Sequence, residues 1–112
     1  METASHWIEA LPLAQLADQA ILCVRVEGTH VLLLRDGEHI VACERACPHE
    51  QADLSLGRIV GGRLVCPRHL ASFDLNDGSI STGWPSRPLR RYPIRITDGV
   101  VWIDIAAIDG KD

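Results

Sequence analysis

Short apolar stretches separated by turn residues run through most of the chain. The stretches are rich in Val, Ile and Leu, and turn signals recur about every ten to fifteen residues, which leaves too little room for ordinary helices. This pattern is typical of a small all-β domain. We expect strands at residues 6–10, 20–26, 30–35, 38–43, 58–60, 63–66, 72–75, 79–81, 92–96 and 100–105, with one helical turn within 13–19.

Turn residues pair these strands into antiparallel hairpins. Asp36-Gly37 lies between two apolar runs and predicts a tight turn with positive φ at both central residues. Gly61-Gly62, Asn76-Asp77-Gly78 and Asp98-Gly99 predict three further hairpins. Residues 83–88 contain two prolines, which have no N–H to donate to a sheet, so this segment should cross the surface.

Length and composition narrow the class of protein. A chain of 112 residues is long enough for one domain, residues 1–112, with its own core. The net charge of −4 argues against binding to nucleic acid. No apolar run approaches the roughly 18 residues of a membrane span, and the N-terminus lacks the pattern of a secretory signal. We therefore expect a soluble cytoplasmic protein that meets other proteins.

Four cysteines in a cytosolic protein favour metal binding over disulfides. Two of them have a histidine beside them, in Cys47-Pro48-His49 and in Cys66-Pro67-Arg68-His69, with residues 50–65 between the two motifs. Cys23 and Cys43 lie in apolar, strand-like stretches, so we expect them to be buried core residues.

Two kinds of metal centre use two cysteines and two histidines. One is structural zinc with four protein ligands, although zinc fingers usually place both cysteines in one knuckle and both histidines on a later helix. The other is a [2Fe-2S] cluster in which two histidines replace two cysteines on one iron. Each loop of this chain supplies one residue of each type, which lets both loops reach both irons and favours the cluster.

The motif spacing, Cys-x-His and then Cys-x-x-His, resembles the Rieske signature. Together with residues 54–57 and 73–74, it is similar to the soluble Rieske ferredoxins of bacterial oxygenase systems. The resemblance implies a small antiparallel β-sandwich with a cluster-binding subdomain of two loops, at about residues 44–84. It also implies that Cys47 and Cys66 bind one iron while His49 and His69 bind the other.

Departures from the family pattern predict the redox behaviour. High-potential Rieske proteins carry an additional disulfide between the two ligand loops, where this chain has Ala52 and Arg68. They also place a serine and a tyrosine where this chain has Ala71 and Phe73, and those hydroxyls donate hydrogen bonds to the cluster sulfurs. Without such donors we expect a potential near the low end of the Rieske range of about −150 to +300 mV.

The resemblance implies a monomeric one-electron carrier that is not itself an enzyme. It would accept electrons from an NAD(P)H-oxidising flavin reductase and pass them to the Rieske centre of a terminal oxygenase in aromatic-ring hydroxylation. The docking interfaces should be small and short-lived, and electrons should leave through the ligand histidines. Two alternatives stay open: a permanently bound Rieske-like subunit of a nitrite-reductase-type enzyme, with a large apolar docking face, and a colourless, zinc-stabilised interaction module.

Overall fold

A computed structural model describes residues 5–48, 52–67, 71–81 and 87–106 of the chain. These residues form antiparallel strands with two short helical turns, which confirms the predicted all-β class. In chain order the elements are β1 (Trp7–Pro12), α1 (Gln15–Asp18), β2 (Ile21–Val26), β3 (Thr29–Asp36), β4 (His39–Glu44), the 3₁₀ turn η1 (Leu54–Leu56), β5 (Arg58–Val60), β6 (Arg63–Val65), β7 (Ser72–Asp74), β8 (Arg91–Tyr92), β9 (Ile94–Thr97) and β10 (Val100–Asp104).

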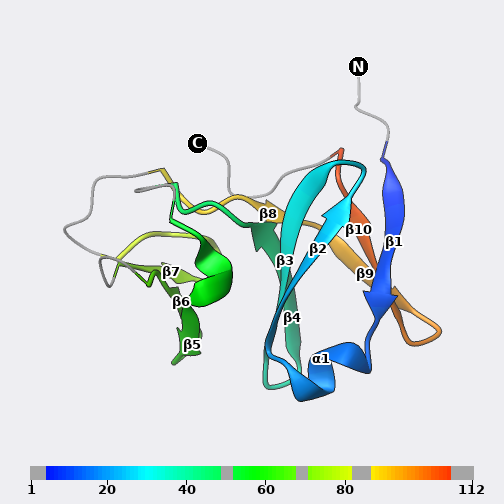
Figure 1. Ribbon diagram of the computed structural model, residues 1–112, viewed down its shortest axis with the longest axis horizontal. Helices are drawn as coiled ribbons and strands as arrows, with labels where there is room; N and C mark the ends of the chain where they lie inside the picture. The colour runs from blue at the N-terminus through cyan, green and yellow to red at the C-terminus, as the bar shows by residue number, and fades with distance from the viewer. Residues whose placement is uncertain (1–4, 49–51, 68–70, 82–86, 107–112) are drawn as a thin grey trace.

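The strands form three small sheets arranged in layers. The central sheet has the order β2-β3-β4-β8, a second sheet has the order β1-β10-β9, and a third has the order β5-β6-β7. In Figure 1 the central sheet stands between the other two, with β5, β6 and β7 on one side and β1, β9 and β10 on the other. The sandwich and the separate small subdomain agree with the expected Rieske-type architecture.

Strand β3 separates two hydrophobic cores. Val31 and Leu33 pack into the core against β1 and β10, whereas Leu32 and Leu34 pack into the core against β6, β7 and the predicted ligand loops. All four side chains are fully buried. Successive side chains of a strand point to opposite faces, so a strand that is covered on both sides is apolar throughout. The uninterrupted apolar run of residues 31–34 therefore marks the strand that contributes side chains to both cores.

The hairpin turns agree with prediction in place but not always in type. Asp36 pairs with His39, so the turn residues are Gly37 and Glu38 rather than Asp36 and Gly37. Of these residues only Gly37 has positive φ, at 65°, which is the pattern of a type II′ turn and not of the predicted type I′. The Gly61-Gly62 turn has positive φ at both positions, 56° and 77°, as a type I′ turn requires.

One strand prediction was wrong, and one predicted hairpin is shorter than expected. The expected strand at 92–96 is divided by Pro93, which has no N–H donor: β8 pairs with β4, and β9 pairs with β10. The expected hairpin at 72–81 is present but short: Phe73 bridges Ile80, and the N–H groups of Asp74 and Ser81 donate to the carbonyls of Ser79 and Ser72, each at 2.8 Å, while the other edge of β7 pairs with β6. In the described part of the chain, no helix is long and apolar enough to span a bilayer.

Candidate metal centre

Two loops of matching construction carry the predicted cysteine ligands. The N–H of Cys47 donates to the carbonyl of Ala52 at 2.8 Å, and the N–H of Cys66 donates to the carbonyl of Ala71 at 2.7 Å. Each cysteine thus begins a loop that closes on the fifth residue after it. The predicted ligands His49 and His69 fall inside these loops but lie outside the described residues, so the structure places the two thiols and not the two imidazoles.

Both thiols lie in the same buried cluster. Cys47 follows the end of β4 and Cys66 follows the end of β6, and both residues are fully buried in the core between the central sheet and the sheet of β5, β6 and β7. Phe73 and Ala71 are buried as well. Ala71 and Phe73 stand where high-potential Rieske proteins have hydroxyl donors. They are therefore buried, apolar neighbours of the loops.

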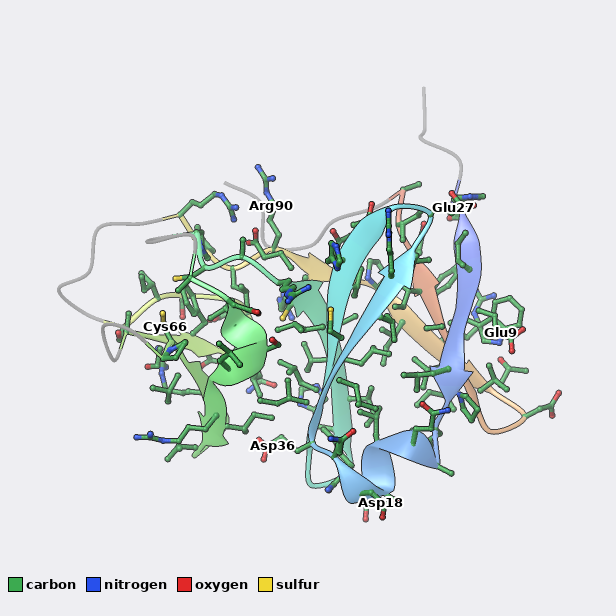
Figure 2. All side chains as sticks on the ribbon, viewed as in Figure 1. Glu9, Asp18, Glu27, Asp36, Cys66 and Arg90 are labelled. Atoms are coloured by element: carbon green, nitrogen blue, oxygen red, sulfur yellow. The ribbon has the colours of Figure 1, made fainter. Side chains whose placement is uncertain are left out.

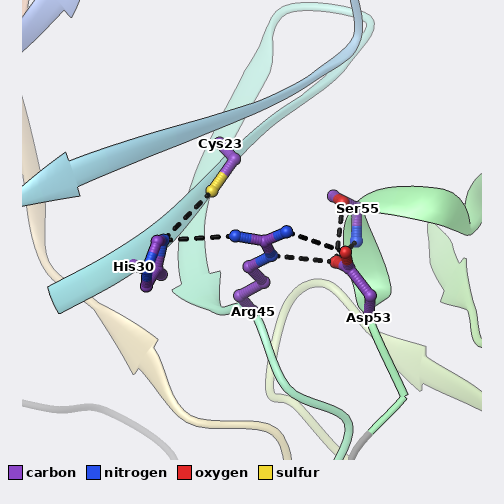
Figure 3. A network of polar contacts seen from close by, with 5 residues as sticks. All are labelled: Cys23, His30, Arg45, Asp53 and Ser55. Carbon is purple, nitrogen blue, oxygen red and sulfur yellow. Dashed lines mark hydrogen bonds and ion pairs between the residues drawn. The ribbon is translucent and has the colours of Figure 1, made fainter.

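An ion pair closes the base of the first loop. The guanidinium of Arg45 donates through Nη2 to Oδ2 of Asp53 at 2.8 Å and through Nε to Oδ1 at 3.0 Å (Figure 3). The backbone closes at the same level, since the N–H of Leu54 donates to the carbonyl of Arg45 at 2.9 Å. We call this Arg45–Asp53 contact the loop clasp. It joins the residues on either side of the 47–52 loop and fixes the path on which Cys47 enters the core.

Asp53 is held as a carboxylate by its neighbours. Besides the guanidinium, Ser55 donates to Oδ1 through its backbone N–H at 3.0 Å and through its hydroxyl at 2.6 Å, which caps the 3₁₀ turn η1. The hydrogen bonds from Arg45, and then those from Ser55, hold the pKa of Asp53 well below its usual range. The same pairing raises the pKa of Arg45.

The clasp continues to the β2–β3 hairpin. Nη1 of Arg45 lies 3.2 Å from Nδ1 of His30, and that nitrogen lies 3.9 Å from Sγ of Cys23 (Figure 3). The expectation of a buried Cys23 was wrong, because this thiol is exposed on β2, an edge strand of the central sheet. The thiol faces His30, although Ile21 on the same face of the strand packs against the core. The sequence signal that could have shown this is the turn at 27–28, which places Cys23 opposite Leu32 and diagonal to His30.

The other cysteine outside the motifs is a core residue, as predicted. Cys43 is fully buried in β4, and burial, followed by the nearby charge of Glu44, raises the pKa of its thiol. A neutral thiol in a strand is a poor metal ligand, because thiolates are the form that binds metals. The described residues therefore offer Cys47 and Cys66, at the ends of two loops of similar construction, as the donors that fit a thiolate-binding metal group.

A second ion pair, which the sequence analysis did not predict, holds a third segment beside the loops. Glu44 accepts from Nη1 of Arg87 at 2.7 Å and from Nη2 at 2.8 Å, and it also accepts from the backbone N–H of Arg90 at 2.7 Å. Glu44 and Arg87 are 43 positions apart in the chain. The backbone N–H of Leu89, which lies between Arg87 and Arg90, donates to the carbonyl of Gly78 at 2.8 Å. Residues 87–90 are thus tied both to the base of the first loop and to the turn after β7.

Several known proteins resemble this chain in sequence and in fold. The chain is 31% identical over 100 residues to the ferredoxin component of the naphthalene 1,2-dioxygenase system of Pseudomonas putida, covering 89% of this chain and 96% of that protein. Among solved structures, the ferredoxin of Sphingomonas yanoikuyae B1 superposes with a TM-score of 0.79 at 26% identity, covering 88% of this chain and 98% of that one.

A chain in the complex of reduced oxygenase and oxidized ferredoxin in carbazole 1,9a-dioxygenase superposes with a TM-score of 0.78 at 25% identity, covering 88% of this chain and 92% of that chain. Some matched structures are much larger, and this chain spans 33% of the NdmA chain of Pseudomonas putida CBB5. Residues 6–93 match the family model described as the Rieske [2Fe-2S] domain. The chain therefore belongs to the Rieske [2Fe-2S] domain family, whose cofactor is a [2Fe-2S] cluster with cysteine and histidine ligands.

Proposed function

We propose that this chain is a one-electron carrier of an aromatic-ring-hydroxylating dioxygenase system. It takes electrons from an NAD(P)H-dependent flavin reductase and passes them to a terminal Rieske non-haem iron oxygenase, as a soluble cytoplasmic monomer. The observation that carries the proposal is the match to a dioxygenase ferredoxin component along 96% of that protein's length. The likeness to a chain in an oxygenase and ferredoxin complex supports the direction of transfer.

The residues that would hold the cluster are those of the two motifs, within a domain of residues 1–112 and a cluster-binding part at about 44–84. Cys47 and Cys66 would bind one iron, and His49 and His69 the other. When bound, the cluster accepts and releases single electrons. The protein's part is to fix the ligands: the loop clasp holds the first loop, and the surrounding core keeps water from the buried thiols. The two imidazoles are the proposed exit, since each keeps a second nitrogen for a partner.

The described surface favours a carrier over a permanently bound subunit. Obligate interfaces are large and apolar, whereas the described residues expose three large hydrophobic side chains, those of Leu56, Val60 and Ile96. Such a surface suits repeated, short-lived docking with two partners. A zinc-stabilised module has no comparable support, because the matching family holds a [2Fe-2S] cluster.

Stopped-flow transfer to an oxygenase tests the function. The anaerobic protein is reduced with dithionite, desalted and mixed with oxidised terminal oxygenases, among them that of the naphthalene 1,2-dioxygenase system of Pseudomonas putida and those of the source organism. The proposal predicts second-order reoxidation of the carrier, followed by the absorbance of its cluster, and, with substrate and O₂ present, one hydroxylated product for every two electrons delivered. A reduced protein that transfers electrons to none of these oxygenases would overturn it.

A further inference from the structure

Two exposed apolar side chains flank one exposed arginine beside the cluster loops. Leu56 is 72% exposed and Val60 is 53% exposed, the two highest values among the large hydrophobic residues that the structure describes as exposed. Arg58 lies between them and is also exposed. Arg58 and Val60 belong to β5, which is an edge strand of its sheet, so this side of the sheet has no neighbouring strand. We call these three residues the β5 edge.

The β5 edge borders a hollow that is also lined by Cys66, a predicted cluster ligand. A hollow of about 200 Å³ is lined by Leu56, Gly57, Arg58, Val65, Cys66 and Pro67. Gly57 lets the backbone at this position lie close against β6, because a Cβ here would be 2.2 Å from the carbonyl oxygen of Val65. A partner seated on the β5 edge would thus rest directly over the loop that begins with Cys66.

The charge of the chain is distributed unevenly, with the β5 edge in the positive part. Residues 44–93 contain seven arginines and five acidic residues, a net +2, whereas the remaining residues contain four basic and ten acidic residues, a net −6. Figure 2 shows Cys66 and Arg90 on one side of the molecule and Glu9 and Glu27 on the other. Such a separation of charge orients an approaching molecule and accelerates encounter with an acidic surface.

Among the arginines of residues 44–93 that the structure describes, Arg58 is the one that is exposed. Arg45 and Arg87 are engaged with Asp53 and Glu44, and Arg63 lies 3.8 Å from Asp74. In the described ranges, no carboxylate forms an ion pair with Arg58. A lone arginine between two exposed apolar side chains suits a protein face on which a carboxylate stands among apolar residues, because arginine is a typical interface anchor and the apolar area beside it is removed from water on contact.

We propose that the β5 edge is the docking site for the terminal oxygenase, and that the oxygenase meets it with an apolar face bearing an aspartate or glutamate opposite Arg58. This inference rests on the proposed carrier function. Leu56 and Val60 provide contact area that is lost again when the partner leaves, and Arg58 sets the orientation. The contact stays small enough for the carrier to dissociate after each electron.

The test compares variants of the β5 edge with matched variants elsewhere on the molecule. Leu56→Gln and Val60→Thr are paired with Ile96→Thr, the remaining exposed large hydrophobic residue, which lies in β9. Arg58→Glu is paired with Arg25→Glu, which reverses an exposed arginine in β2. Each protein is reduced and mixed with an oxygenase that accepts electrons from the unaltered chain, at low and high salt, after its midpoint potential and EPR spectrum have been matched to those of the unaltered protein.

The β5 edge variants should each transfer electrons about tenfold more slowly at limiting concentrations, which corresponds to a loss of about 1.4 kcal/mol of binding free energy per side chain. The defect of Arg58→Glu should shrink as the salt concentration rises, while the Ile96→Thr and Arg25→Glu proteins stay within twofold of the unaltered chain. Edge variants that match their controls would overturn the docking site and leave the carrier function intact. Failure of the unaltered chain with every oxygenase would instead refute the carrier function, and the docking site with it.

Discussion

Removing the carboxylate of Glu44 should loosen the third segment, which would stay attached to the base of the first ligand loop through the hydrogen bond from the N–H of Glu44 to the carbonyl of Arg90. Glu44 accepts three hydrogen bonds, two from Arg87 and one from the N–H of Arg90. The side chains of Arg87 and Glu44 are 25% and 16% exposed, so water screens the pair only in part. Hydrogen bonds to charged groups contribute about 1.5 to 3 kcal/mol each and do not add fully, which gives about 2 to 3 kcal/mol for Glu44→Ala.

A cost of this size should lower the unfolding midpoint by about 10 °C in a domain of this length. Far-UV circular dichroism of the anaerobic protein measures it. Glu44→Gln keeps an acceptor oxygen and should lose about 1 kcal/mol, and Glu38→Ala, an exposed glutamate in the β3–β4 turn, should melt like the unaltered chain. The reasoning is refuted if Glu44→Ala melts within about 2 °C of the unaltered protein, because the ion pair would then contribute almost nothing.

Three further outcomes follow from single sites. Because the folded protein lowers the pKa of Asp53, the stability that its carboxylate contributes is complete at neutral pH and declines as the pH falls below about 4. In urea titrations, Asp53→Asn should lower the free energy of unfolding by about 1 kcal/mol at pH 7 and by less at pH 2, and an equal loss at both pH values would contradict this. When the cluster-loaded protein is treated with iodoacetamide at pH 8, peptide mass spectrometry should find Cys23 alkylated and Cys43 unmodified, because burial keeps Cys43 a neutral thiol. Alkylation of Cys43 in the folded protein would contradict this and show that its strand opens. Protein-film voltammetry should give a midpoint potential below about 0 mV, because Ala71 and Phe73 bring no hydroxyl donors, and a higher value would contradict that argument.

The sequence was a good guide wherever local chemistry determines structure. Short apolar runs and glycine at turns placed the β2–β3 and β3–β4 hairpins, and the spacing of Cys47 and Cys66 pointed to two loops, which the structure closes in the same way. Pro93 divided a strand that the apolar pattern alone had joined, although its missing N–H could have been considered. The turn at Gly37 shifted by one residue because the cross-strand register, and not the dipeptide, sets which residues turn.

Contacts between distant parts of the chain could not be predicted in this way. Nothing local in Glu44 indicates that it meets Arg87, and Cys23 looked like a core residue because its neighbours in the chain are apolar. Its exposure depends on which element covers that face of β2, which is a property of the tertiary arrangement. The same holds for Leu56 and Val60, whose exposure beside Cys66 emerges only from the packing of β5 against β6.

EPR spectroscopy of the anaerobically purified, dithionite-reduced protein tests the central claim most directly. The account predicts the signal of a histidine-ligated [2Fe-2S] cluster, together with about two irons and two acid-labile sulfides per chain. Replacement of His49 or His69 by cysteine should shift that signal toward the all-cysteine type. An EPR-silent protein that contains one zinc ion per chain would contradict the account.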